Sequence, residues 1–144
     1  MGKPRIRPIV LGLIRHQGHI FVSQGNDTVK DQVFYRFLGG GIDFGETSVD
    51  ALKREFQEEI QAELTNIEYL TCLDNIFTCN GKPGHELIQL FRCDFVSPKF
   101  YDLDRTYTLI EGKRKCDAIW IPTTQVRSAQ LNLVPEACHR YIYD

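Results

Sequence analysis

The order of apolar and polar residues predicts β-strands in the first part of the chain. Residues 6–15 and 19–23 are rich in β-branched and aliphatic side chains, and Gly18 separates them, so we expect a hairpin here. The polar residues 24–32 predict an exposed loop, and residues 33–38 predict a short strand that follows this loop.

The later part of the chain repeats this strand pattern. Residues 64–78 and 86–95 carry β-type sequence on either side of a strong turn signal at residues 80–84, which predicts a longer hairpin. A further strand at residues 118–121 ends at Pro122. Short helices are expected at residues 123–128 and 135–143.

One central helix is predicted between these two groups of strands. Three consecutive glycines at residues 39–41 predict a loop, and Thr47 or Ser48 can then cap a helix that runs to about residue 61. The apolar stripe of this helix consists of Val49, Leu52, Phe56 and Ile60. Strands on both sides of one helix indicate an α+β or α/β layer architecture with a mixed sheet, in a single domain over residues 1–144.

A second face of the helix is acidic. Glu55, Glu58 and Glu59 occupy positions i, i+3 and i+4, so their carboxylates form one ridge, roughly 110° around the helix from the apolar stripe. We therefore expect the ridge to border the core without entering it. A hard cation such as Mg²⁺ would relieve the repulsion among these oxygen ligands. The alternative is a solvated glutamate face, stabilised by Lys53 and by the pair of Arg54 with Glu58.

The wider segment has a fixed spacing: Gly40, five residues, Glu46, seven residues, then Arg54-Glu55-Phe56-Gln57-Glu58-Glu59. This pattern resembles the signature of the Nudix hydrolases, and the six matching positions favour the metal-site interpretation over the solvated face. Two positions depart from the family pattern, because Gln61 replaces the usual Gly and Ala62 replaces a bulky hydrophobic residue. That Gly helps the chain to leave the helix, so the departure affects the exit loop more than the carboxylates.

The resemblance implies a fold and an activity. The fold is a Nudix-type α/β/α sandwich, in which a mixed sheet lies between helices. The activity is Mg²⁺-dependent hydrolysis of a diphosphate linkage in a nucleoside diphosphate derivative, with Mn²⁺ as a substitute metal. Elementary chemistry agrees, because an anionic diphosphate resists attack by water unless cations neutralise its oxygens.

The resemblance also implies roles for individual residues. The metal ligands would be the side chains of Glu55, Glu58 and Glu59 and the main-chain carbonyl of Gly39. Arg54 would orient Glu55 by a charge-assisted hydrogen bond, while Glu46 and Gly40 would support the loop and the helix from behind the ligands. We expect Glu55 or Glu58 to be the general base, with Glu111 as a rival base or an extra ligand.

The substrate class is less closely defined. Residues 75–80 carry none of the short motifs that distinguish family members acting on ADP-ribose, diadenosine polyphosphates or reduced dinucleotides, which favours a nucleoside triphosphate or a related small nucleotide. The alternative is a nucleotide-sensing module that binds without turnover, although such a module has no need for the complete acidic set. An RNA-decapping enzyme is disfavoured by the near-neutral charge.

Composition and charge exclude several other classes. Hydrophobic residues make up 42% and charged residues 25% of the chain, as in folded globular proteins. A formal net charge of -2 argues against a nucleic-acid partner. No apolar stretch approaches the roughly 18 residues of a membrane span, and Arg7 and Arg15 interrupt the first apolar run, so we expect no membrane association. Five cysteines without a C-x-x-C pair predict free thiols and a cytoplasmic location.

The sequence assigns neither substrate-binding residues nor an oligomeric state. His85 and Glu86 are expected to be ordinary strand-end residues, with a substrate or metal contact as the alternative. Several aromatic side chains are core candidates, of which one or two could stack on a nucleobase: Phe34, Tyr35, Phe37, Phe77 and Trp120.

Overall fold

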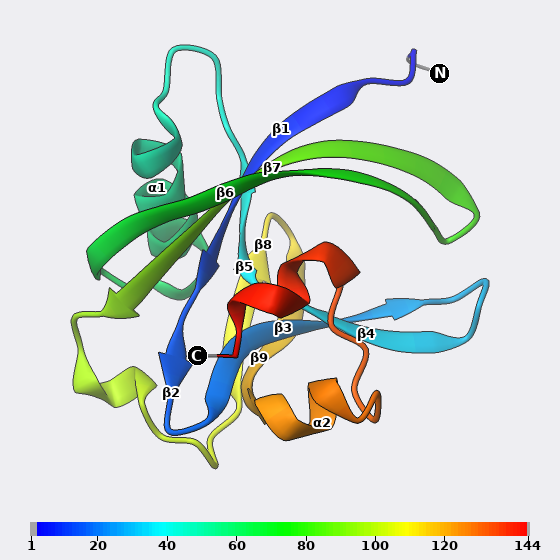
Figure 1. The fold of residues 1–144 in the computed structure, drawn as a ribbon. Helices are drawn as coiled ribbons and strands as arrows, with labels where there is room; N and C mark the ends of the chain where they lie inside the picture. Colours follow the sequence, from blue (N-terminus) through cyan, green and yellow to red (C-terminus); the bar gives the residue numbers. More distant parts are fainter. Residues whose placement is uncertain (1–2, 144) are drawn as a thin grey trace.

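The computed structural model describes residues 3–143, whose strands form two sheets (Figure 1). The first has the strand order β5-β1-β7-β6 and contains β1 (Ile6–Leu13), β5 (Leu38–Gly41), β6 (Leu64–Cys79) and β7 (Lys82–Phe95). The second contains β2 (Arg15–His16), β3 (His19–Asp27), β4 (Gln32–Arg36), β8 (Tyr107–Glu111) and β9 (Arg114–Pro122). The first sheet is mixed, because β1 runs parallel to β7 and antiparallel to β5.

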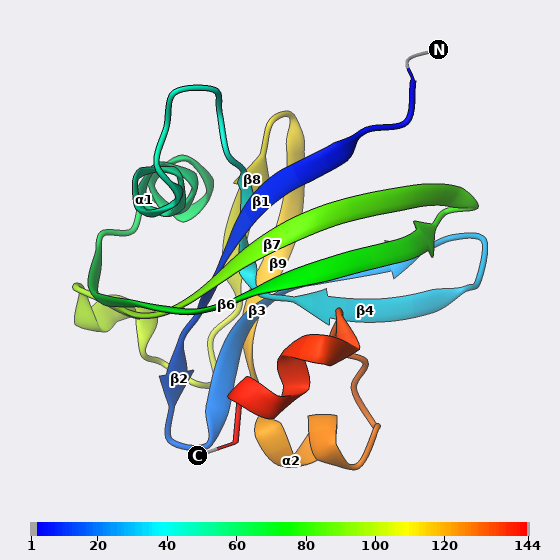
Figure 2. The ribbon, with the colours of Figure 1, turned by 45° about the horizontal axis from the view of Figure 1, so that its top comes forward.

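Helices lie on two sides of these sheets, so the α+β fold class is confirmed. In Figure 2, α1 (Ser48–Ile60) is seen nearly end-on at one side, whereas α2 (Thr123–Arg127) and the 3₁₀-helix η2 (Glu136–Tyr141) lie at the other. A second 3₁₀-helix, η1 (Pro98–Phe100), follows β7. Within residues 3–143, no helix is long and apolar enough to cross a membrane.

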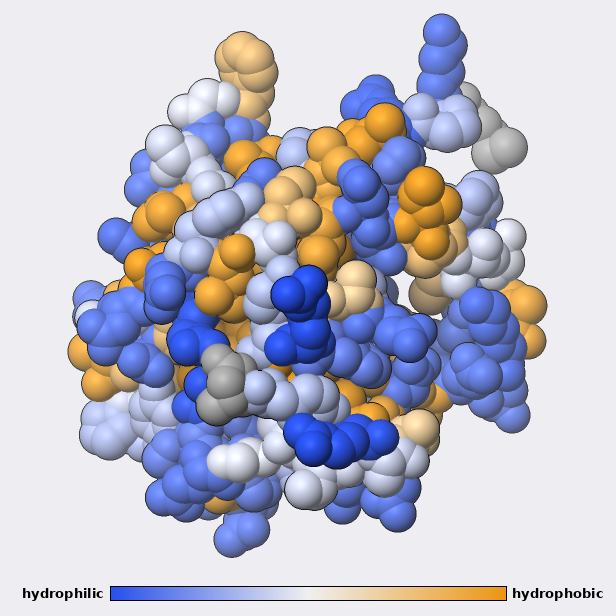
Figure 3. Space-filling view, in the orientation of Figure 1, coloured by the Kyte–Doolittle hydropathy of each residue, from blue (hydrophilic) through white to orange (hydrophobic). Residues whose placement is uncertain are grey.

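From Ile9 to Leu13, strand β1 is buried on both faces and separates two hydrophobic clusters. Val10 packs in the cluster that contains Leu52 and Phe56 of α1. Ile9 and Leu11 pack in the cluster that also contains residues of α2 and η2. On the face that Figure 3 displays, hydrophilic residues are interspersed with small groups of hydrophobic ones.

The prediction that residues 6–15 and 19–23 form a hairpin is wrong for most of these residues. Arg15 and His16 pair back onto β3, next to a hydrogen bond from the Phe21 N–H to the Ile14 carbonyl, whereas β1 pairs with β5 on one edge and with β7 on the other. A continuous aliphatic run that is buried on both faces is typical of a central strand, and such a strand needs two neighbours that a local turn cannot supply.

Two further expectations are corrected. The predicted loop at 24–32 is mostly strand, because β3 continues to Asp27 and β4 begins at Gln32. The glycines at 39–41 are not a loop but belong to β5, where bare backbone allows close approach to β1. Strand β8, which ends at Glu111, was not predicted at all.

The remaining elements agree with their predictions. The long hairpin is formed by β6 and β7, the strand at 118–121 lies within β9, and helices occur near both predicted positions, the last of them as the 3₁₀-helix η2. All five cysteines are free thiols.

Helix α1 begins and ends close to the predicted residues. The Thr47 hydroxyl accepts a hydrogen bond of 3.1 Å from the Asp50 N–H, which caps the first turn. At the other end, Gln61 adopts a left-handed conformation with φ of 55°, and its N–H donates a hydrogen bond to the Gln57 carbonyl. Family members place Gly here because Gly enters this region without strain; this chain makes the same turn with Gln61.

Candidate active site

Four carboxylates converge on one cleft from two elements. Glu55, Glu58 and Glu59 project from α1, and Glu111 lies at the end of β8. All four line a hollow together with Gly39 and other residues of β5. A Cβ atom on Gly40 would lie 2.5 Å from the Glu55 carboxyl carbon, so the glycine strand lets this carboxyl pack against main chain.

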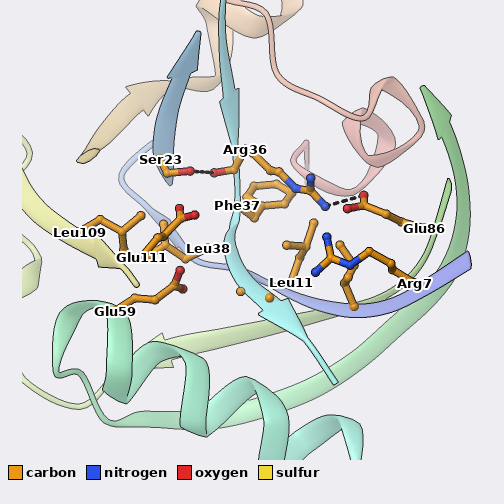
Figure 4. Close-up of a pocket in the computed structure, with 13 residues that line it drawn as sticks. Arg7, Leu11, Ser23, Arg36, Phe37, Leu38, Glu59, Glu86, Leu109 and Glu111 are labelled. Atoms are coloured by element: carbon orange, nitrogen blue, oxygen red, sulfur yellow. Dashed lines mark hydrogen bonds and ion pairs between the residues drawn. The ribbon is translucent and has the colours of Figure 1, made fainter. Parts of the chain in front are cut away.

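Burial differs strongly along the ridge. Glu58 keeps 59% of its side chain exposed, Glu55 keeps 15%, and Glu59 as a whole residue is only 6% exposed. The expectation that the ridge stays outside the core is therefore wrong for Glu59. Its carboxylate points toward that of Glu111 beside Leu109 of β8 (Figure 4), and this strand was absent from the sequence prediction.

Within residues 3–143, no Lys or Arg side chain forms an ion pair with the Glu59 carboxyl. Burial, followed by the negative charges of Glu111, Glu55 and Glu58, raises the pKa of Glu59 to about 9, although a hydrogen bond from the Gly39 main chain opposes the rise. Its Oε1 atom is buried and accepts no hydrogen bond from the described residues. A buried acceptor of this kind costs folding free energy unless a ligand satisfies it.

Arg54 organises the outer part of the ridge. Its guanidinium donates to both carboxylate oxygens of Glu46, at 2.7 and 2.9 Å, and to the Gly41 carbonyl at 2.9 Å. It also donates to Glu55 at 3.1 Å and to Glu58 at 3.3 Å. The Arg54 side chain therefore connects β5, the loop after β5 and two carboxylates of the ridge.

Glu46 lies behind the ridge rather than in it. The hydrogen bonds from Arg54, followed by the bond from the Asp43 N–H, lower the pKa of Glu46 to about 2. The carboxylate stays ionised over the working pH range and fixes the loop that leads into α1.

The Glu46→Gln variant tests this support. A depressed carboxyl pKa contributes stability that is complete above the ordinary value of 4.5 and is lost as the pH falls toward 2. We expect the variant to have a lower urea midpoint than wild type at pH 7, and the difference to shrink between pH 4.5 and 2. Glu68→Gln, at an exposed position of β6, is the matched control. A difference that does not change with pH would contradict the ion-pair assignment.

The donor set fits a divalent cation. Hard cations take carboxylate and carbonyl oxygens, and an unsatisfied oxygen of Glu59 faces three other carboxylates. Within residues 3–143, no three His, Cys, Asp or Glu side chains are already arranged as a finished metal site. The carboxylates of Glu55 and Glu58 instead accept hydrogen bonds from Arg54.

Two arginines extend the site beyond the carboxylates. Arg36 of β4 and Arg7 of β1 line a hollow together with Glu59 and Glu111 (Figure 4). Arg36 donates to Glu86 at 2.7 Å, and Glu86 is buried rather than an ordinary strand-end residue. Sequence reasoning missed both arginines. Arg7 lies on the same side of β1 as the buried Ile9 but is itself exposed, so the hydrophobic pattern of the strand gave no signal for it.

The glycine strand, the capped helix and its convergent glutamates together define a known class of protein. The family model for the NUDIX domain matches residues 3–141, and the chain belongs to the Nudix family. The predicted resemblance is thereby confirmed.

Solved structures support the fold. A NUDIX hydrolase from Nitrosomonas europaea superposes with a TM-score of 0.68 at 17% identity, covering 96% of this chain and 86% of that one. A MutT NUDIX hydrolase from Burkholderia pseudomallei gives a TM-score of 0.63 at 20% identity, covering 83% and 85%.

Two curated relatives are similar in sequence. The mitochondrial NAD(P)H pyrophosphatase NUDT13 of Mus musculus is 26% identical over 119 residues, which are 76% of this chain and 33% of the relative. The NAD-capped RNA hydrolase NudC of Edwardsiella ictaluri is 29% identical over 94 residues, which are 65% of this chain and 34% of the relative. The chain thus spans about a third of the length of these relatives.

Proposed function

We propose that this protein is a pyrophosphohydrolase that uses a divalent cation to cleave a diphosphate linkage in a small nucleotide derivative. The observation that carries the proposal is the cleft in which four carboxylates converge and Glu59 keeps a buried oxygen without a partner. Carboxylate oxygens are the ligands that hard divalent cations prefer, and the family membership supports the reaction class.

The residue roles follow from charge and contact. Glu55, Glu58, Glu59 and the Gly39 carbonyl would hold Mg²⁺ or Mn²⁺, and the bound cation would neutralise the diphosphate and activate water. Arg54 positions Glu55 through its hydrogen bond. Glu55 or Glu58 would accept the proton of the attacking water, and Glu111 remains the rival base.

We propose a nucleoside triphosphate or a related small nucleotide as the substrate. A second candidate, a dinucleotide with an internal diphosphate, is favoured by the names of the two curated relatives, one of which acts on NAD(P)H and the other on NAD-capped RNA. The near-neutral charge supports a free nucleotide over a nucleic acid, and five free thiols support a cytoplasmic location.

The proposal is tested by phosphate or diphosphate release from a panel of nucleoside triphosphates, nucleotide sugars, ADP-ribose, NADH and dinucleoside polyphosphates. Each substrate is assayed with Mg²⁺ and with a chelator. We expect turnover of at least one class, abolished by the chelator and restored by added metal. If no substrate of the panel is hydrolysed but calorimetry detects tight nucleotide binding, the nucleotide-sensing module would be favoured instead.

A further inference from the structure

A second cavity lies beside the carboxylate cleft, between two long β-ribbons. One ribbon is formed by β3 and β4 and the other by β6 and β7, and both extend to the same side of the molecule in Figures 1 and 2. The cavity has a volume of about 350 Å³, which lies within the range of small-molecule sites. Phe34 and Phe77 line it, one from each ribbon.

Each phenyl ring lies over a glycine of its own ribbon. Phe34 of β4 is paired with Gly25 of β3, and Phe77 of β6 is paired with Gly84 of β7. A Cβ atom added to either glycine would overlap the paired ring. Both rings therefore rest against bare backbone, which gives each ribbon a flat aromatic surface.

These rings lack the partners that other aromatic residues have. Phe21, Phe95 and Trp120 form edge-to-face ring contacts with one another in the core. Among the described residues, neither Phe34 nor Phe77 contacts another aromatic ring, and both are only half-buried. Two unpartnered rings that line one cavity from two different ribbons are suited to a planar aromatic guest.

The far end of the cavity is closed by contacts between the ribbon tips. The Asn80 Oδ1 atom accepts hydrogen bonds from the N–H and the hydroxyl of Thr28, at 2.8 and 3.0 Å. Lys30 Nζ donates to the Thr78 carbonyl at 3.2 Å. Hydrogen bonds from main-chain N–H groups, chiefly that of Lys30, also lower the pKa of the buried Asp27, whose carboxylate therefore stays ionised at the tip.

The near end leads toward the carboxylates. Arg36 lines both this cavity and the hollow that contains Glu59 and Glu111, so the two spaces share one wall. Arg7 supplies positive charge between the aromatic end and the acidic end, and Arg36 lies there with its guanidinium hydrogen-bonded to Glu86. A molecule that fills both spaces must join a planar apolar group to a polyanion.

We propose that Phe34 and Phe77 hold the nucleobase of the substrate between them, with the diphosphate lying past Arg36 toward the glutamates. This inference rests on the proposed hydrolysis. Because the ribbon tips close the cavity behind the base, the cavity contacts the nucleoside half of the substrate. The group on the other side of the diphosphate lies outside the cavity. Stacking on both faces accepts every base, so selection between bases falls to polar groups of the cavity.

The test compares Phe34→Leu and Phe77→Leu with Tyr69→Leu. Leu keeps an apolar side chain of similar volume but removes the ring. Tyr69 is a matched control, because it lies on β6 like Phe77 but is 53% exposed and packs on Phe91 instead of lining the cavity. For the best nucleotide of the panel, each Phe variant should raise KM roughly tenfold with kcat within about twofold. Inhibition by inorganic diphosphate should be unchanged.

Calorimetry with the four nucleoside monophosphates separates this inference from the hydrolysis. We expect wild type to bind at least one of them and each Phe variant to weaken that binding roughly tenfold, with Tyr69→Leu unaffected. Unchanged binding in both Phe variants, or no binding to wild type, would overturn the base site even if the enzyme is active. Weakened binding without any turnover would retain the base site and reject the proposed hydrolysis.

Discussion

Replacing Glu58 and Glu59 together by Gln is expected to lower kcat at least about a thousandfold, because two proposed cation ligands and a candidate base are lost at once. The fold should survive. Glu58 is exposed, and Gln at position 59 matches the size of the buried Glu59 side chain without adding a charge beside the other glutamates. The measurement is kcat at saturating Mg²⁺, with circular dichroism to verify folding.

The single variant Glu63→Gln is the control for this double change. Glu63 is exposed, follows α1 and does not line the carboxylate cleft, so its replacement should leave kcat within about twofold of wild type. Hydrolysis that persists in the double variant would locate the cation elsewhere and reject the assignment of Glu58 and Glu59.

The second large effect is expected at Gly39. A Cβ atom there would overlap the main-chain carbonyl oxygen of Val10 in the neighbouring strand β1, at a φ of 153° that side chains rarely adopt. Backbone cannot move aside as a flexible side chain can, so Gly39→Ala should lower the free energy of unfolding by about 3 kcal/mol or more. Urea denaturation, followed by fluorescence of Trp120, measures this loss.

Gly18→Ala separates crowding from backbone conformation. Gly18 also has a positive φ, of 73°, but no heavy atom lies within 4 Å of the place a Cβ would occupy. Its replacement should cost only about 1 kcal/mol. Equal losses in the two variants would mean that β5 can move away from β1, and that close packing is not the reason for glycine at position 39.

The features that were predicted from sequence depend on neighbours along the chain. The apolar spacing of Leu52 and Phe56 and the cap at Thr47 are properties of a few turns of helix, and they gave α1 nearly its observed limits. The spacing from Gly40 to Glu59 is likewise local, and it identified the family before any contact was known.

The features that sequence missed depend on pairing between distant segments. Glu59 is buried because β8 comes to lie against α1 some 50 residues later in the chain. Arg36 meets Glu86 across a separation of 50 residues. The glycines at 39–41 predicted a loop because glycine is common where the backbone must be flexible. In β5 glycine is needed for its small size instead, and the sequence alone does not distinguish the two reasons.

The parallel pairing of β1 with β7 has a consequence for biosynthesis. Ile6 lies opposite His85 and Leu13 lies opposite Arg92, so the second neighbour of the first strand is translated about eighty residues after it. The cleft then takes Glu111 from a strand translated still later. A nascent chain on the ribosome therefore has the complete acidic helix long before it has the sheets and the cleft, and no fragment that ends before residue 111 can contain all four carboxylates.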